Sequence, residues 1–149
     1  MKTGILLLNL GTPDSPLLRD VAAYLSDFLM DRRVVDIPFL LRALLVFGLI
    51  VPRRSFSSAK AYKKIWIEQG SPLLVNSLHI KNKLQVKLGE TYIVNLAMRY
   101  GRPKIKDQLD SLLQQNCSKI VILPLFPQYS SAATGSAIAK VLQELQVIL

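Results

Sequence analysis

Residues 122–136, ILPLFPQYSSAATGS, lead from an apolar run into a segment without a charged side chain. The segment carries aromatic rings at Phe126 and Tyr129, several hydroxyl groups and Gly135, whereas a solvent-exposed turn ordinarily carries charged or amide side chains. Rings, hydroxyls and small residues line pockets in which a few polar atoms orient a mainly apolar ligand. The segment is therefore a candidate ligand-contacting loop.

Other binding and catalytic chemistries lack their usual sequence patterns. The chain contains neither the GxxxxGK[ST] phosphate loop nor the GxGxxG dinucleotide motif. With one histidine and one cysteine it cannot form a structural zinc site, so we predict no metal site and no permanently bound cofactor. His79 has no partner in the sequence and is interpreted as a surface or boundary residue rather than a ligand or base, and Cys117 is interpreted as an inert thiol.

The chain is strongly basic. Its 149 residues contain 19 Lys and Arg against 10 Asp and Glu, a formal net charge of +9. Such an excess favours an anionic partner, namely nucleic acid, a membrane surface or a small acidic ligand. We expect no nucleic acid, because the basic residues alternate with a long apolar segment and no nucleic-acid-binding motif is present. A single cysteine and the lack of a cleavable signal sequence indicate a cytoplasmic protein.

The elements that must position the candidate loop follow an α/β pattern. Short continuous apolar runs are typical of buried strands in a parallel sheet, and here each is followed by apolar residues at helical spacing. This alternation predicts a Rossmann-like α/β domain with a parallel sheet flanked by helices and right-handed crossovers. The predicted strands are residues 3–11, 92–100 and 119–126.

Ligands of open parallel sheets bind beside the carboxyl ends of the strands. Those ends carry the sequences NLGTPDSP, AMRYGRP and FPQYSSAATGS, so the candidate loop lies where a ligand is expected. Asp14 and Ser15 are the predicted N-cap of the first helix, with Pro16 in its first turn. Thr134 is the predicted cap of the last helix.

Residues 37–51, IPFLLRALLVFGLIV, contain one charged side chain, Arg42. As a helix the segment would be about 22 Å long, too short for the ~30 Å hydrocarbon core of a bilayer. Two interpretations remain: a helix buried in the core, or an exposed apolar lip that contacts a membrane or closes over an apolar ligand. Residues 52–64 are basic without an acidic residue, which is typical of a solvated helix face but also suits anionic headgroups or a flat carboxylate.

A set of motifs gives the chain a resemblance to a known family. The motifs are KTGILLLNLGTP, FLMDRRVVDIP, AYKKIW followed by GSPLLV, AMRYGRP and LPLFPQYSSAATGS, in this order along essentially the whole chain. They resemble the ferrochelatases, and the apolar lip Ile37–Val51 resembles that of the membrane-associating, protoporphyrin-using branch. The resemblance implies insertion of ferrous iron into protoporphyrin IX in the last step of haem synthesis. It also implies two Rossmann-like domains with the porphyrin between them, at the cytoplasmic face of the inner membrane.

The resemblance assigns porphyrin contacts residue by residue. Arg54 is expected to pair with a propionate, and Tyr62 and Ser71 to donate hydrogen bonds. Leu10 stands where relatives place a methionine or tyrosine close to the macrocycle, and Ala133 stands where they usually have a threonine. The remaining expected contacts are Arg99, Tyr100, Tyr129 and Ser130. For the Arg–Tyr pair among these, the alternative is a buried arginine satisfied by backbone carbonyl groups.

Metal insertion needs a base for the pyrrole protons and a ligand that delivers the metal. In the family resembled these are a histidine and a glutamate in the second half, and His79 does not match that motif. No catalytic residue and no metal ligand is therefore assigned in this chain. Residues 1–149 are expected to be the amino-terminal ferrochelatase domain, without the carboxyl-terminal half and inactive alone. The alternative is a non-catalytic α/β module that binds a porphyrin or another anionic ligand.

Overall fold

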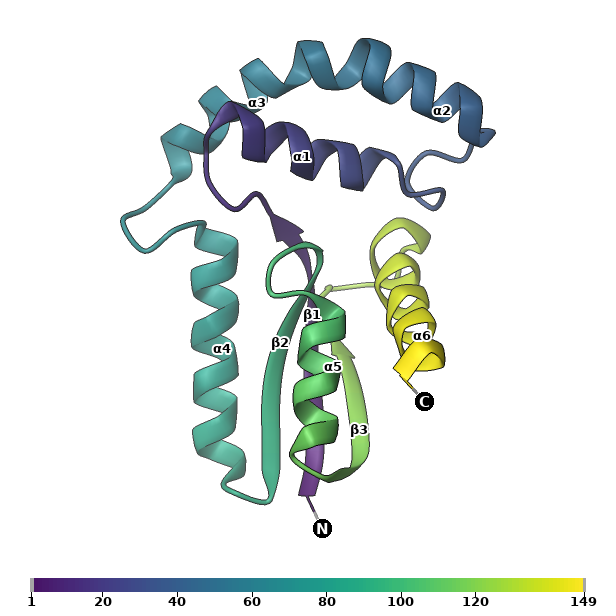
Figure 1. Cartoon of the computed structure of the whole chain (residues 1–149). Helices are drawn as coiled ribbons and strands as arrows, with labels where there is room; N and C mark the ends of the chain where they lie inside the picture. Colours follow the sequence, from purple (N-terminus) through teal and green to yellow (C-terminus); the bar gives the residue numbers. More distant parts are fainter. Residues whose placement is uncertain (1, 149) are drawn as a thin grey trace.

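The computed structural model describes residues 2–148, which form an open parallel sheet flanked by helices (Figure 1). The strands are β1 (Lys2–Thr12), β2 (Tyr92–Gly101) and β3 (Cys117–Pro124), in the order β2-β1-β3. The central strand β1 pairs in parallel with both neighbours, so the Rossmann-like α/β prediction is confirmed. β3 begins earlier than predicted because the polar residues at its start still pair through their backbone with β1.

Helices cover both faces of the sheet. They are α4 (Pro72–Leu88), α5 (Ile105–Gln114) and α6 (Ser136–Ile148). Ile5 and Leu7 of β1 belong to the core beneath α4, while Leu6 and Leu8 belong to the core beneath α5 and α6. Successive side chains of a strand point to opposite faces, so burial on both faces requires β1 to be apolar throughout. The continuous apolar run of the sequence has this origin.

The carboxyl ends of β1 and β2 approach each other very closely. Gly11 and Gly101 have positive φ angles of 116° and 82°. A Cβ atom at Gly11 would lie 1.8 Å from the carbonyl oxygen of Tyr100, and one at Gly101 would lie 2.5 Å from that of Thr12. Both positions therefore require glycine, and the two strand ends can meet only because no side chain intervenes.

A second layer of helices lies beyond the carboxyl ends of the strands. It consists of α1 (Leu18–Leu29), α2 (Phe39–Leu45), the π-helical turn η1 (Val46–Ile50) and α3 (Val51–Ile65). α1 crosses above the sheet, and α2, η1 and α3 form a continuous arch over α1 (Figure 1). The arch contains residues 39–51 of the apolar segment, which therefore lies at the edge of the sheet where a ligand is expected.

The predicted start of the first helix is wrong. α1 begins at Leu18, and its N-cap is Leu17, which has an extended backbone and makes no side-chain cap. The Ser15 hydroxyl donates instead to a carboxylate oxygen of Asp20 at 2.6 Å and accepts a hydrogen bond from the backbone N–H of Leu17 at 3.2 Å. Ser15 therefore organises the turn before the helix rather than capping the helix itself.

The predicted cap of the last helix is also wrong. A π-helical turn, η2 (Ser131–Gly135), precedes α6, and Ser130 caps it by accepting a hydrogen bond from the backbone N–H of Ala133 at 3.1 Å. The hydroxyl oxygen of Thr134 is buried and has no hydrogen-bond partner within residues 2–148. The capping residue lies four positions earlier than predicted because the helical path begins with the extra turn η2.

Candidate functional site

The apolar segment Ile37–Val51, called the lip below, lies on the surface. Its outer side exposes Leu40 by 80%, Leu44 by 72% and Phe47 by 54%, while Val46 on its inner side is fully buried. The interpretation of this segment as a helix buried in the core is therefore wrong. No helix within residues 2–148 is long and apolar enough to cross a membrane.

Arg42, the charged residue of the lip, is buried. Its Nη1 donates hydrogen bonds to the carbonyl oxygens of Val35 at 3.1 Å and Ile37 at 3.2 Å, and its guanidinium lies 5.9 Å from the ring centroid of Phe39. Its Nε has no hydrogen-bond partner in the described part of the chain. Arg42 thus fastens the start of the lip to the preceding loop.

α3 continues the lip with a basic surface. The guanidinium of Arg54 is exposed and makes no hydrogen bond or ion pair with any of residues 2–148. The opposite side of α3 buries Ser55 and Ala59, whose small side chains let the helix pack closely on α1. The exposed basic residues of α3 are Arg53, Arg54, Lys60, Lys63 and Lys64.

An aromatic cluster joins α1 and α3 to β2. Tyr24 packs edge-on against Tyr62 at a centroid distance of 6.4 Å and against Tyr100 at 6.5 Å. Phe28 packs edge-on against Tyr100 at 5.3 Å, and Tyr62 against Trp66 at 6.2 Å. These edge-to-face contacts are favourable geometries for aromatic rings, and they fix the half-buried Tyr62 in place. Burial raises the pKa of Tyr62, so its hydroxyl remains a hydrogen-bond donor at neutral pH.

Ser71 and Leu10 lie near the carboxyl end of β1. Ser71 is buried at the N-cap of α4, and its Oγ accepts a hydrogen bond from the Thr12 hydroxyl at 2.8 Å, which leaves its own O–H to donate. Leu10 is half-buried, and its backbone N–H donates to the side-chain oxygen of Asn9 at 2.8 Å. The hydroxyl pair joins the end of β1 to the start of α4.

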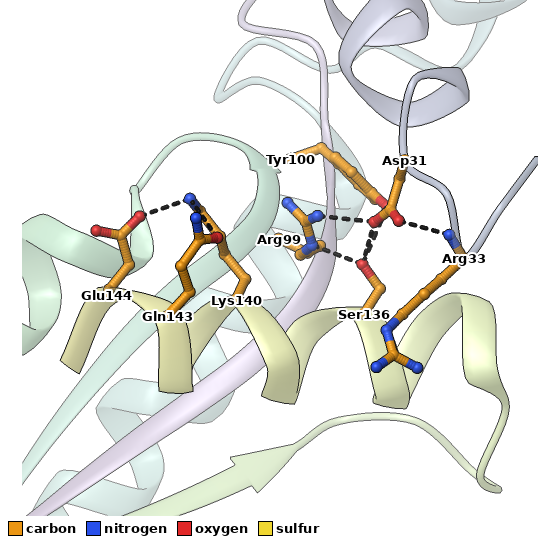
Figure 2. Close-up of polar contacts among 8 residues, drawn as sticks. All are labelled: Asp31, Arg33, Arg99, Tyr100, Ser136, Lys140, Gln143 and Glu144. Atoms are coloured by element: carbon orange, nitrogen blue, oxygen red, sulfur yellow. Dashed lines mark hydrogen bonds and ion pairs between the residues drawn. The ribbon is translucent and has the colours of Figure 1, made fainter. Parts of the chain in front are cut away.

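Arg99 and Tyr100 converge on the carboxylate of Asp31 (Figure 2). The Arg99 Nη2 lies 2.7 Å and the Tyr100 hydroxyl 2.7 Å from Asp31 Oδ2, to which the Ser136 hydroxyl also donates. The Arg99 Nε donates to Ser136 Oγ at 2.6 Å, and the backbone N–H of Arg33 donates to Asp31 Oδ1 at 2.8 Å. We call these five residues the Asp31 network.

Burial and hydrogen bonds within the Asp31 network shift the pKa values of Asp31 and Tyr100. Burial raises the pKa of the Asp31 carboxyl, but its hydrogen-bond donors and the charge of Arg99 outweigh burial and lower that pKa below its ordinary value. Burial, together with the hydrogen bond to Asp31, raises the pKa of Tyr100 to about 12. At neutral pH Asp31 is therefore a carboxylate that accepts, and Tyr100 a phenol that donates.

Tyr129 lies in the candidate loop and is 72% exposed. A Cβ atom at Gly135 would lie 3.2 Å from the Tyr129 hydroxyl and 3.4 Å from Arg33 Nη1. The part of the candidate loop that carries Tyr129, the turn η2 and the residues after α1 therefore lie close together around Gly135. A cavity of about 480 Å³ beside them is lined by Asp31, Arg32, Arg33, Asp36 and Ser131.

The family model described as Ferrochelatase matches residues 2–148 of this chain. The chain belongs to the ferrochelatase family. It is 54% identical over 145 residues to the ferrochelatase of Legionella pneumophila (strain Paris), an alignment that covers 97% of this chain and 43% of that relative. It is 46% identical over 140 residues to the ferrochelatase of Coxiella burnetii (strain Dugway 5J108-111), covering 94% of this chain and 40% of that relative. The chain therefore spans less than half the length of the curated ferrochelatases it matches.

The site residues expected from the ferrochelatase resemblance lie at or beyond the carboxyl ends of the strands, but in different environments. Arg54 and Tyr129 are exposed, Leu10 and Tyr62 are half-buried, and Ser71 is buried. Ser130 is exposed and caps η2, while Arg99 and Tyr100 give their polar groups to Asp31. The structure therefore divides the set into groups that are available to a ligand and groups that are already bonded.

Asp31 is a residue that the sequence analysis did not single out. It lies within FLMDRRVVDIP, which contributed to the family resemblance, but a single aspartate after an apolar helix has no pattern of its own. Its partners are 68 and 105 residues away along the chain. Only their approach in space reveals its role, because no local spacing connects them.

No group of three or more His, Cys, Asp or Glu side chains that could hold a metal ion occurs within residues 2–148. His79 lies exposed in the middle of α4, as predicted from the sequence. Cys117 is a half-buried thiol at the start of β3.

Proposed function

We propose that the chain is the amino-terminal part of a ferrochelatase that inserts ferrous iron into protoporphyrin IX, and that it supplies one wall of the porphyrin site. Membership of the ferrochelatase family supports the reaction. The observation that supports this role is the exposed guanidinium of Arg54, which has no hydrogen-bond or ion-pair partner among residues 2–148. Arg54 lies on the basic helix that directly follows an exposed apolar lip. A porphyrin combines a wide apolar face with two carboxylates, and this surface offers matching chemistry.

Each contact has a distinct role in this proposal. Arg54 pairs with a propionate, and the bond is strong because a guanidinium can donate two parallel hydrogen bonds to one carboxylate. Tyr62 and Ser71 donate hydrogen bonds from positions fixed by the aromatic cluster and by Thr12. The further contacts with the macrocycle are Leu10, Tyr129 and Ser130. Arg99 and Tyr100 act from beneath this surface, because their polar groups already bind Asp31.

We assign the proton-accepting base and the ligand that delivers iron to a second, carboxyl-terminal domain. The relatives have more than half of their length outside the region that this chain matches, which gives room for such a domain. The residues proposed above bind and orient the porphyrin. Holding the macrocycle against the metal supplies the positioning that a metal-insertion reaction requires.

We also propose that the lip contacts an anionic membrane surface at the cytoplasmic face. Leu40, Leu44 and Phe47 would insert among the acyl chains, while the exposed basic residues of α3 pair with headgroups. Apolar side chains this exposed are unfavourable in water, and a membrane would remove that cost. This orientation would place the porphyrin site beside the phase in which an apolar substrate dissolves.

A complementation assay tests the reaction. The 149-residue chain is mixed with the carboxyl-terminal remainder of the 54%-identical Legionella relative, and anaerobic insertion of ferrous iron into protoporphyrin IX is followed. We expect insertion by the mixture, and no insertion above the protein-free rate by either piece alone. Porphyrin binding without insertion by the mixture would favour the non-catalytic binding module. Insertion by the chain alone would contradict the assignment of the base and metal ligand to a second domain.

A further inference from the structure

We propose that Asp31 is a positioning residue that holds the lip at a fixed place relative to the loop of residues 127–135. The proposal rests on the proposed function in one respect: these two segments carry the surfaces that would contact a porphyrin. The geometric part of the proposal stands independently of any ligand.

The carboxylate of Asp31 is fully used for internal contacts. Its side chain is 9% exposed, and that of its ion-pair partner Arg99 is 18% exposed. Oδ2 accepts from Arg99 and Tyr100 at the end of β2 and from Ser136 at the start of α6, while Oδ1 accepts from the backbone N–H of Arg33. One carboxylate therefore joins the loop after α1 to the sheet and to α6 (Figure 2).

Asp31 is connected to the lip by consecutive hydrogen bonds. Its backbone carbonyl oxygen accepts from the backbone N–H groups of Val34 and Val35, each at 3.0 Å. The carbonyl oxygens of Val35 and Ile37 in turn accept from the buried guanidinium of Arg42 in α2. The loop between α1 and the lip is thus fixed by a bonded residue at each end.

Asp31 is connected to the other segment through Ser136. Ser136 is the first residue of α6 and directly follows η2, so its hydrogen bond to Asp31 fixes the end of the loop that carries Tyr129. Arg33, whose backbone is bonded to Asp31, also places its Nη1 beside Gly135, the last residue of η2. The segment between α1 and the lip therefore meets the loop directly, and the lip and the loop share one anchoring carboxylate.

This arrangement suits positioning better than ligand binding. A ligand anion would have to displace Asp31 from Arg99, and both side chains are mostly enclosed. Buried ion pairs contribute little net stability compared with apolar packing, but they hold their partners in one arrangement when every donor and acceptor is satisfied. Asp31 meets that condition, and it joins elements that are distant in sequence.

Distance measurements between paired spin labels test the proposal. In a Cys117→Ser background, one pair of labels is placed at Leu40 in the lip and Gln128 in the loop, both exposed. A reference pair is placed at Lys83 on α4 and Lys119 on β3, also exposed and within the sheet layer. We expect Asp31→Asn to broaden the lip-to-loop distribution while the reference distribution stays unchanged. Asp110→Asn, which breaks the surface pair with Lys106, should change neither.

Milder variants keep the test decisive where Asp31→Asn does not fold. Tyr100→Phe and Ser136→Ala each remove one hydrogen bond to Asp31 without leaving a buried charge. Both should broaden the lip-to-loop distribution by less than Asp31→Asn, with Ser136→Ala acting on the loop side. An unchanged distribution in these variants, or equal broadening of the reference pair, would overturn the positioning role.

Porphyrin titration of the same proteins separates this proposal from the proposed function. We expect Asp31→Asn to bind protoporphyrin several-fold more weakly than the unmodified protein. At saturating protoporphyrin, the lip-to-loop distance distribution of this variant should become narrow again, because a ligand that contacts both segments replaces the lost connection. Absence of porphyrin binding by the unmodified protein would refute the proposed function, while the label distances would still decide the role of Asp31.

Discussion

Two arginines that the sequence assigns to one ligand site have opposite environments in the structure. Arg99 is enclosed and bonded to Asp31 and Ser136, whereas Arg54 is exposed on α3 and has no polar partner within residues 2–148. Arg99 therefore carries out a structural task, whereas the donors of Arg54 stay free within residues 2–148, as the proposed propionate contact requires. A guanidinium in a family motif does not by itself identify a ligand contact, because its function depends on which acceptors the fold has already placed beside it.

The largest expected effect is the loss of the partner of Arg99. Asp31→Ala leaves a mostly enclosed guanidinium without its carboxylate, and removing one member of a buried pair typically costs ~3–5 kcal/mol of unfolding free energy. Arg54→Ala removes an exposed side chain and should change that free energy by less than ~0.5 kcal/mol. Denaturant unfolding of both variants measures the difference. Equal losses would mean that the two arginines do not differ as described.

The lip offers the same contrast among apolar side chains. Val46→Ser replaces a fully buried side chain by a polar one and should cost roughly 2–4 kcal/mol through lost burial and an enclosed hydroxyl. Serine at the exposed Leu40, Leu44 and Phe47 together should leave stability nearly unchanged but abolish sedimentation with anionic vesicles. If the triple variant unfolds instead, the outer side of the lip contributes to the core and the contrast fails.

The Asp31 network predicts a specific pH dependence. The pKa of Asp31 is lowered in the folded protein, so its stabilising contribution is present above its unfolded value of about 3.9 and is lost as the pH falls through the folded value. Asp31→Asn lacks this contribution, so its deficit in unfolding free energy should be largest at neutral pH and shrink in acid. Urea unfolding across the acid range checks this. A deficit that stays constant with pH would mean that the charge of Asp31 is not involved.

The smallest effect is expected at an exposed ion pair that also joins a basic side chain to an aspartate. Lys106 and Asp110 are one helical turn apart on α5, with N and O atoms separated by 2.9 Å. Because both groups reach solvent, Asp110→Asn should cost only ~0.3–0.5 kcal/mol, and added salt should remove most of it. A loss comparable to that of Asp31→Ala would show that enclosure is not what distinguishes the Arg99 pair.

The fold was predictable from the sequence because its signals are local. The apolar runs of β1 and β2 and the spacing in the helices reflect burial on both faces of a parallel sheet, and the structure confirms them. The helix starts were less predictable. Leu17 precedes α1 without capping it, and the extra turn η2 moves the cap from Thr134 to Ser130. An N-cap depends on backbone geometry that composition alone does not determine.

The site was predictable in its parts but not in its connections. Motifs identified Arg54 and Tyr62, and both lie on α3. Asp31 was missed because its donors come from β2 and α6, which no spacing in the sequence relates to it. The exposure of the lip was undecided for a similar reason: fifteen mostly apolar residues suit a core and a surface equally, and only the packing of Arg42 and Val46 decides which side faces inward.

The most direct test of the central claim combines two changes, as in a double-mutant cycle: Arg54 is replaced by alanine, and the porphyrin propionates are esterified. Binding of protoporphyrin IX and of its dimethyl ester is measured for the unmodified protein and for Arg54→Ala, with Lys83→Ala on α4 as a control of equal charge change. An ion pair at an exposed site predicts a coupling of ~1 kcal/mol between Arg54 and the free propionates, so that Arg54→Ala weakens the diacid about fivefold and the ester hardly at all. Lys83→Ala should weaken neither. Equal weakening of diacid and ester by Arg54→Ala, or an equal effect of Lys83→Ala, would contradict the claim that Arg54 is reserved for a ligand carboxylate.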